Sequence, residues 1–478
     1  MKRIFSVFLI IFLCLNMTFN FSVFTFADES ETEAETDNDT ENSSGSGEWP
    51  EAPEINGTAA VLIEASTGTV LYEKNAHDKM YPASITKILT GILTIENCSL
   101  SETVTFSESA VNIPSDASNI EAQEGEEMSV KDCLYGLLLA SGNEVANALA
   151  EHVAGSTDAF AEMMNEWATE AGATDSHFAN PSGLHDENHY ITAYDMAMIA
   201  KRAIKNPVFL SITGTCEHII SPTNKTDTER ELNMTHKMVW SGEYSSVAYD
   251  GVLGGKTGYT DEAGTTLVTY AERDGMTLIC VVLNSNSYNV YYDTADLFDY
   301  GFDNFTLYNI SENESMFSGT SNLSGVTTLT SAFSTSNPLF EISSDDYIVL
   351  PNTASFSDTE VSASLNDSDD SDDDSAVATL TYTYAGKTVG TTTVIQTSTG
   401  SSDSESSVSD DSSIKAEEAV ETTATVSFKD KIKAHSSLIT KIVVAIIVII
   451  IIIIIIRIIR KKFQNISETR TQKRTRYR

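Results

Sequence analysis

Three short motifs that could together form a serine acyl-transfer site occur in one order along the chain. They are Ser84-Ile85-Thr86-Lys87, Ser141-Gly142-Asn143 and Lys256-Thr257-Gly258. A serine hydroxyl is a weak nucleophile at neutral pH, so acyl transfer needs a nearby base, a proton relay and a cation that holds the substrate. The three motifs offer a candidate for each role.

Ser84 and Lys87 are the candidate nucleophile and general base. Apolar residues recur at helical spacing after residue 82, so Ser84 is expected at a helix start with Lys87 on the same face. Burial and a second cation, for which Lys256 is the candidate, would lower the pKa of Lys87 until its neutral amine could take the Ser84 proton. The free N–H groups of a helix start suit an oxyanion. Alone, the first motif would only be a solvated helix start.

The second and third motifs supply the relay and the substrate contacts. Ser141 can relay a proton, and Asn143 offers both a donor and an acceptor to a substrate amide. Lys256 and Thr257 can hold a carboxylate, while Gly258 lets a substrate backbone approach a strand edge. A phosphate loop is the competing interpretation, but the segment does not match GxxxxGK[ST].

The surrounding pattern predicts the elements that must position these motifs. Alternation and helical periodicity indicate a hairpin over 59–73, helices over 130–139, 144–152, 158–170 with Thr157 as its cap, 193–204 and 294–300, and strands over 265–270 and 276–283. Beyond residue 305, short alternating runs at 346–350 and 378–384 indicate a small β domain. Its acidic loop, 367–374, is expected to be a hairpin tip rather than a calcium site.

With the motifs placed, the chain resembles the serine-type D-alanyl-D-alanine carboxypeptidases, the low-molecular-mass penicillin-binding proteins. The set of SxxK, SxN and KTG motifs in this order is specific to penicillin-interacting serine enzymes. The segments 180–184, 189–197 and 255–260 are also similar to stretches of that family. The resemblance covers roughly residues 50 to 305 well and the following β domain more weakly.

The resemblance implies an α+β fold. A β-lactamase/transpeptidase-like domain, an antiparallel sheet flanked by helices, would precede the small all-β domain and a C-terminal transmembrane helix. It also implies that Ser84 is acylated by the penultimate D-alanine of a peptidoglycan stem peptide, which releases the terminal D-alanine before water frees the enzyme. β-Lactam antibiotics would be covalent inhibitors, and neither cofactor nor metal is expected.

The resemblance further assigns substrate contacts. The N–H groups of Ser84 and Tyr259 would form the oxyanion hole, and Lys256 and Thr257 would hold the terminal carboxylate. Family members often have an arginine after the strand that corresponds to 278–282. Here residues 284–292 contain none, which weakens the carboxylate site.

The ends of the chain predict export and anchoring. Positive residues, an apolar run and a small residue make 1–27 a signal peptide, and the apolar residues 438–459 suit a membrane span. By the positive-inside rule, the basic segment after the span belongs in the cytoplasm. The chain between Ala27 and Lys441 is therefore expected outside the cell. The expected organisation is signal peptide 1–27, acidic disordered spacer 28–50, catalytic domain 51–304, small β domain 305–396, acidic linker 397–435, span 438–459 and cytoplasmic tail 460–478.

Composition and isolated residues leave several alternatives. The formal net charge of −40 argues against nucleic-acid binding. The histidines at 185 and 189 lack the order and helix of a zinc motif, and the cysteines show no metal spacing and no decidable disulfide pairing. Apolar neighbours make Cys133 and Cys280 candidates for buried free thiols.

A β-lactamase would share the three motifs but needs a water-activating glutamate, and Glu162, Glu166 and Glu170 fit a solvated helix face instead. A membrane-tethered, non-enzymatic wall-binding protein is the third possibility.

Overall fold

The computed structural model describes residues 48–314, 340–365 and 376–396. All of them belong to the compact unit Met1–Ser401. The predicted signal peptide, most of the spacer, the acidic loop, the linker, the membrane span and the basic tail lie outside the described residues. Across the described ranges, no helix has the length and apolarity needed to cross a membrane.

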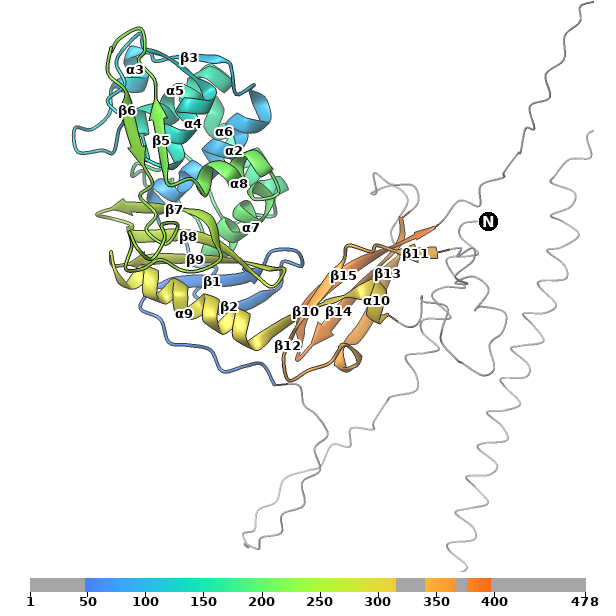
Figure 1. Cartoon of the computed structure of the whole chain (residues 1–478). Coiled ribbons are helices and arrows are strands. Elements are labelled where there is room, and N and C mark those ends of the chain that lie inside the picture. The colour runs from blue at the N-terminus through green and yellow to red at the C-terminus, as the bar shows by residue number, and fades with distance from the viewer. Residues whose placement is uncertain (1–47, 315–339, 366–375, 397–478) are drawn as a thin grey trace, which may run out of the picture. The chain divides into compact units, whose positions relative to one another are not determined.

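The part of the chain that contains the three motifs is built around a five-stranded antiparallel sheet (Figure 1). Its spatial order is β2-β1-β9-β8-β7, so β7 is an edge strand. The predicted hairpin is confirmed, because β1 and β2 pair antiparallel. The strands are β1 (Ala59–Glu64), β2 (Val70–Lys74), β7 (Val252–Thr260), β8 (Gly264–Arg273) and β9 (Met276–Ser285).

Both faces of this sheet are buried, which explains why its inner strands β1 and β9 are almost continuously apolar. Successive side chains of a strand point to opposite faces. Accordingly Val61 and Ile63 of β1 join one apolar core, whereas Ala60 and Leu62 join another. The long helix α9 (Asn289–Asn304) covers the second core, and the remaining helices of this region gather over the first (Figure 1).

The helices over the first core follow the predicted periodicity closely. They are α2 (Lys87–Asn97), α3 (Glu108–Val111), α4 (Val130–Leu138), α5 (Asn143–Ala154), α6 (Thr157–Glu170), α7 (Ala193–Ala203) and α8 (Pro207–Thr213). The predicted cap of α6 was wrong by one residue, because Ser156 rather than Thr157 accepts the N–H of Ala159. The short helices α3 and α8 and two small hairpins had not been predicted. The hairpins pair β3 (Thr103–Thr105) with β4 (Glu127–Ser129) and β5 (Glu217–Ile220) with β6 (Arg230–Asn233).

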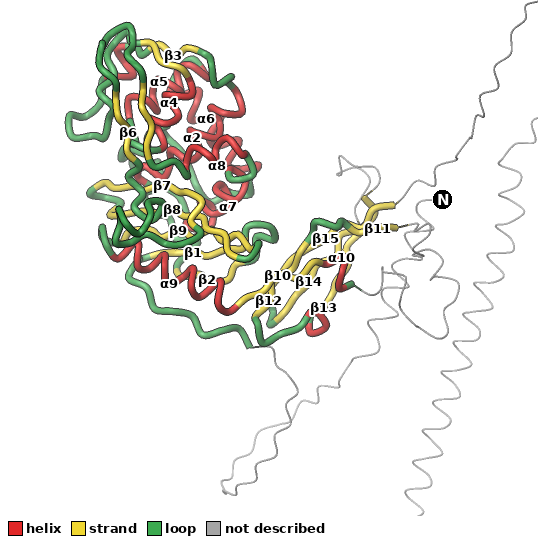
Figure 2. Tube along the Cα trace, in the orientation of Figure 1, coloured by secondary structure: helices red, strands yellow, loops and turns green. Residues whose placement is uncertain are grey.

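Beyond α9 the described chain is mostly strand (Figure 2). Strand β10 (Phe305–Asn309) pairs with β12 (Tyr347–Pro351), and a second sheet has the order β11-β15-β14-β13. These strands share their own core, which includes Ile348, Leu380 and Tyr382. The remaining elements are α10 (Ile310–Asn313), β11 (Phe340–Ile342), β13 (Glu360–Leu365), β14 (Ala376–Tyr384) and β15 (Lys387–Gln396).

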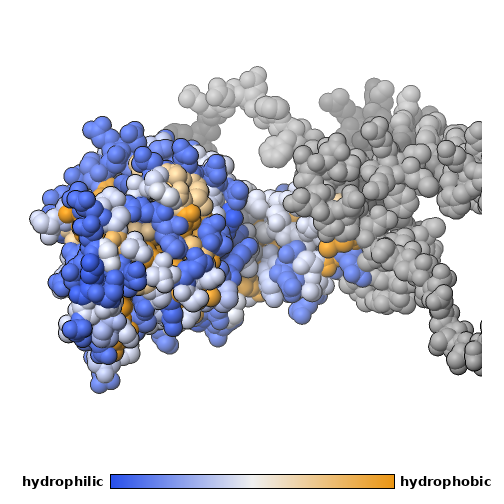
Figure 3. Space-filling model, turned by 90° about the horizontal axis from the view of Figure 1, so that it is seen from above, coloured by the Kyte–Doolittle hydropathy of each residue, from blue (hydrophilic) through white to orange (hydrophobic). Residues whose placement is uncertain are grey.

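The surface of the described residues is largely hydrophilic on the face drawn in Figure 3. Hydrophilic residues cover most of the face visible in Figure 3, with smaller apolar areas between them. Glu162, Glu166 and Glu170 are all exposed on α6, as predicted for a solvated helix face. Cys133 and Cys280 are fully buried free thiols, also as predicted.

Candidate active site

The three motifs converge between the start of α2, the start of α5 and strand β7. Ser84 lies in the 3-10 turn Ala83–Thr86, and Lys87 begins α2 directly after it. The Lys87 ammonium lies 2.9 Å from Ser84 Oγ, 2.9 Å from Asn143 Oδ1 and 2.5 Å from the carbonyl oxygen of Ser182. One lysine nitrogen therefore joins the first two motifs and a third loop.

The partners of Lys87 make its neutral form compatible with the same geometry. Asn143 Oδ1 and the Ser182 carbonyl can only accept hydrogen bonds, whereas the Ser84 hydroxyl can also donate. A neutral amine can donate its two N–H groups to the two carbonyls and accept the Ser84 proton. Complete burial, then the nearby Lys256 charge, hold the pKa of Lys87 well below its ordinary value, and the Glu144 carboxyl opposes them. Burial is thus a larger cause than the second cation.

Lys256 links the second motif to the third. Its side chain is fully buried, and its Nζ donates to Ser141 Oγ at 3.0 Å and to the Thr257 carbonyl at 2.9 Å. Burial lowers the pKa of Lys256 to about 7. At neutral pH this amine can therefore both give and take a proton through the Ser141 hydroxyl.

The KTG segment lies in the second half of β7. A Cβ on Gly258 would meet the Ser84 backbone nitrogen at 2.9 Å, so the edge strand packs directly against the nucleophile. The Thr257 hydroxyl contacts the hydroxyl of Thr235 at 3.0 Å. The Tyr259 side chain is 65% exposed and donates to Asp261, so it points away from the buried lysines.

Strained backbone surrounds the nucleophile. Ala83 has φ +51° and Ser141 has φ +63°, values that residues other than glycine rarely adopt. Gly183 has φ +80°, and a Cβ there would lie 1.9 Å from the Ala83 carbonyl oxygen. Such strain persists only where the surrounding structure imposes it, and it gathers at functional sites.

Two groups beside the site were not predicted. Ser182 contacts Lys87 through its backbone carbonyl oxygen, which every residue type has, so the sequence could not predict this contact. The similarity of segment 180–184 to the family had only indicated that this loop is of interest. Glu144 is buried next to Asn143. Its Oε1 accepts the N–H of Ile120 at 2.6 Å, while its Oε2 has no hydrogen-bond partner among the described residues. Burial raises the pKa of Glu144, which favours the neutral acid.

The two histidines considered for zinc have separate partners in a loop. His185 packs edge-on against Tyr81, with ring centroids 4.6 Å apart. His189 is buried, contacts Thr86 Oγ1 at 2.9 Å and accepts the N–H of Ala179 at 3.3 Å. Burial lowers the pKa of His189 to about 4, so it is neutral at pH 7 where it contacts the turn that carries Ser84.

Comparison with known proteins identifies the family. The profile of the family described as D-alanyl-D-alanine carboxypeptidase matches residues 47–287, half of the chain. The chain belongs to this family. The match includes all three motifs and every residue of the central sheet.

Curated family members share substantial sequence with it. The chain is 39% identical over 234 residues to D-alanyl-D-alanine carboxypeptidase DacF of Bacillus subtilis, across 48% of this chain and 57% of the relative. It is 30% identical over 248 residues to carboxypeptidase DacB2 of Mycobacterium tuberculosis, across 51% of this chain and 81% of the relative. For the B. subtilis protein and several others, the matched part spans less than two thirds of the relative's length.

A solved structure shows the shared fold over a longer stretch. Penicillin binding protein 5 of Haemophilus influenzae superposes with a TM-score of 0.57 at 24% identity, covering 73% of this chain and 98% of that one. The expected transpeptidase-like α+β fold, an antiparallel sheet with helices, is thereby confirmed.

Proposed function

We propose that this chain is a serine D,D-carboxypeptidase that removes the terminal D-alanine from peptidoglycan stem pentapeptides through an acyl-enzyme. The observation that carries the proposal is the pair of fully buried lysines, one bonded to Ser84 and Asn143, the other to Ser141. Membership of the family supports the same reaction. No step requires a cofactor.

In the proposed acylation, neutral Lys87 takes the Ser84 proton as Oγ attacks the carbonyl carbon of the penultimate D-alanine. The oxyanion forms at the N–H groups of Ser84 and Tyr259, where the close packing of Gly258 on Ser84 brings the two backbones together. As the C–N bond breaks, Ser141 gives its proton to the leaving amine, and the Lys256 ammonium replaces it. The proton that Lys87 took from Ser84 then returns to Lys256, which leaves Lys87 neutral again. Water then attacks the ester, and Lys87 again accepts a proton.

The substrate would bind along the open edge of β7. An edge strand presents unpaired backbone groups to which an extended peptide can add. Thr257 and Lys256 would hold the terminal carboxylate, and Asn143 a substrate amide. β-Lactams would acylate Ser84 through the same contacts.

The remaining organisation is part of the proposal. A signal peptide at 1–27, a single span at 438–459 and a basic tail at 460–478 would tether the protein to the cell membrane with the catalytic domain at the cell wall. The β domain at 305–396 and the acidic segments 28–50 and 397–435 would separate the active site from the membrane.

The test is fluorescent-penicillin labelling of the full chain and of Ser84→Ala, followed by D-alanine release from a defined pentapeptide. We expect labelling and release in the wild type and neither in Ser84→Ala. Equal labelling of both chains would refute Ser84 as the nucleophile. Rapid penicillin turnover without D-alanine release would make the protein a β-lactamase. A wild type that neither labels nor releases D-alanine would refute the proposed activity and favour the non-enzymatic alternative.

A further inference from the structure

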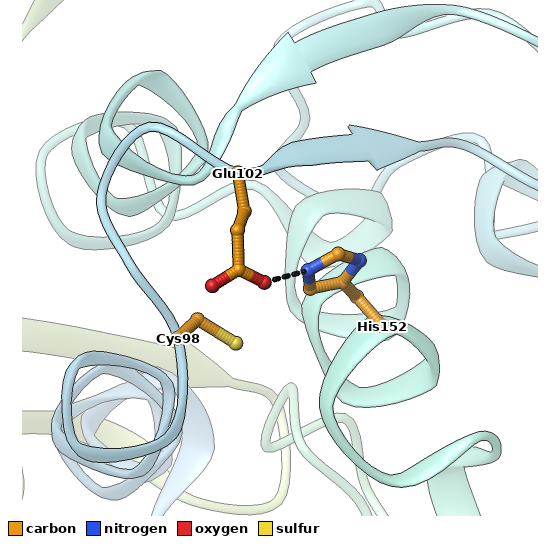
Figure 4. A group of neighbouring side chains, drawn as sticks. All are labelled: Cys98, Glu102 and His152. Carbon is orange, nitrogen blue, oxygen red and sulfur yellow. Dashed lines mark hydrogen bonds and ion pairs between the residues drawn. The ribbon is translucent and has the colours of Figure 1, made fainter.

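Outside the active site, three side chains with metal-binding atoms converge, two from one short segment and the third from a helix 50 residues further along the chain (Figure 4). Cys98 follows the last residue of α2, Glu102 precedes β3, and His152 lies in the last turn of α5. The cysteine sulfur, a carboxylate oxygen and an imidazole nitrogen all lie within 4.8 Å of one another. Thiolate, imidazole and carboxylate are the ligands that zinc takes in proteins.

The spacing of these atoms suits a tetrahedral ion. His152 Nε2 and Glu102 Oε2 are 3.2 Å apart. Two nitrogen or oxygen ligands of tetrahedral zinc, each about 2.05 Å from the ion, lie about 3.3 Å apart. In Figure 4 the Cys98 thiol and the Glu102 carboxylate both face the imidazole. The Cys98 sulfur lies within 4.8 Å of both atoms, and metal binding would draw it closer to complete the set of protein ligands.

The surroundings hold the ligands and leave the cluster open to solvent. The backbone N–H of Ser99 donates to Glu102 Oε1 at 2.5 Å, which orients the carboxylate and leaves Oε2 toward His152. Such contacts fix the orientation of metal ligands. The side chains of His152 and Glu102 are 24% and 45% exposed, so a dissolved ion has access. Cys98 is a free thiol.

We propose that Cys98, Glu102 and His152 bind a divalent transition metal of the zinc class, with water as the fourth ligand. Binding would form a metal–sulfur bond and release the thiol proton to solvent. The Cys98 thiolate and the Glu102 carboxylate would then balance the two charges of the ion.

The site would clamp the two helices that carry catalytic groups. Helix α2 begins at Lys87 and α5 begins at Asn143, whose side chains meet at 2.9 Å. The proposed metal joins the opposite ends of these helices. With both ends tied, neither helix can slide or tilt without breaking a bond, so metal binding would stabilise the domain without taking part in the reaction.

The proposal can be tested by titrating the reduced, chelator-treated full chain in detergent with Co²⁺. We expect one equivalent to produce the thiolate-to-cobalt charge-transfer band of a tetrahedral site, and Zn²⁺ to displace it. Cys98→Ser should abolish the band, and His152→Gln should weaken binding at least about tenfold. Cys216→Ser, at a partly buried cysteine outside the cluster, should retain the band.

Thermal unfolding gives a second readout. Zn²⁺ should raise the Tm of the wild type and Cys216→Ser but not of Cys98→Ser or His152→Gln. A wild type without the charge-transfer band would overturn the proposal and leave the cluster as a plain His152–Glu102 pair. An equal Zn²⁺ shift in the wild type and Cys98→Ser would overturn it as well. Neither readout depends on D-alanine release, so the proposed function stands or fails separately.

Discussion

Replacing Gly183 with alanine tests whether the loop at 180–184 fixes the position of the nucleophile. A Cβ on Gly183 would lie 1.9 Å from the Ala83 carbonyl oxygen and 2.8 Å from Thr86 Oγ1. Real Cβ atoms keep at least about 3.0 Å from such neighbours, so the loop or the turn that carries Ser84 must shift by about 1 Å. Because Lys87 also bonds to the Ser182 carbonyl, the base would move with the loop.

The expected effect has two parts. An alanine at positive φ is strained by about 1–2 kcal/mol, which lowers the free energy of unfolding. A misplacement of about 1 Å can reduce the rate of the reacting group about 100-fold. That factor corresponds to about 2.7 kcal/mol in activation free energy. The second-order rate of acylation by a fluorescent penicillin should therefore fall about 100-fold in Gly183→Ala.

Gly155→Ala is the matched control. Gly155 has φ +83°, close to the +80° of Gly183, but a Cβ there meets nothing within 4 Å. Urea unfolding should show the strain in both variants, whereas stopped-flow acylation should be slowed only in Gly183→Ala. A folded Gly183→Ala chain that acylates at the wild-type rate would refute the fit between loop and turn. Equal slowing in both variants would refute it too, since the backbone strain alone would then be responsible.

Three further results are expected. The pKa of Lys256 is about 7 in the folded chain, below its ordinary value of 10.5. Between these two pH values the folded chain therefore binds fewer protons than the unfolded chain. The free energy of unfolding consequently rises with pH over this range. Lys256→Met should reduce the slope of the free energy of unfolding against pH by up to about 1.4 kcal/mol per pH unit between about pH 7 and pH 8.5, measured by urea unfolding. An unchanged slope would contradict the inference that burial lowers the pKa of Lys256. Lys237 is exposed, its Nζ lies 5.5 Å from the centroid of the Tyr288 ring, and it lies two residues after Thr235, whose hydroxyl contacts that of Thr257 in the KTG strand. Its ammonium is therefore a candidate contact for the substrate carboxylate. Lys237→Ala should raise KM about tenfold for a pentapeptide with a free carboxylate but not for its C-terminal amide. Equal changes for both substrates would exclude Lys237 from the carboxylate site. Timed alkylation of the folded chain followed by mass spectrometry should leave Cys133 and Cys280 unmodified, because burial raises the pKa of both thiols; rapid modification of either would show that the cores open.

The sequence predicted the parts of this fold whose signals are local and repeated. Helices such as α4 and α7 have several turns of apolar periodicity, and β1 and β9 are continuously apolar because the sheet is buried on both faces. The hairpins β3–β4 and β5–β6 escaped prediction since their strands have only three or four residues, half of them exposed. Alternation over so few positions cannot be told from chance.

In the candidate active site, too, the sequence predicts residues with a local motif but not contacts that depend on tertiary packing. The three motifs predicted which side chains the structure brings together, because a proposed nucleophile, base and relay must be particular residue types. The positive φ values of Ala83 and Ser141 could not be predicted, since neither is a glycine and only tertiary packing imposes them. The Thr235 contact to Thr257 depends on a long-range pairing, and the Ser182 contribution comes from a carbonyl that every residue has.

The two buried lysines explain why the site needs so rigid a frame. A charged amine removed from water is strongly disfavoured unless it is paired, and neither Lys87 nor Lys256 forms an ion pair with a carboxylate among the described residues. Folding therefore favours neutral amines, which is the state in which Lys87 can accept the Ser84 proton. The same burial opposes folding, so the two apolar cores around the sheet must supply the compensating stability. A looser frame would admit water, restore the ordinary pKa of both lysines and leave Ser84 without a base.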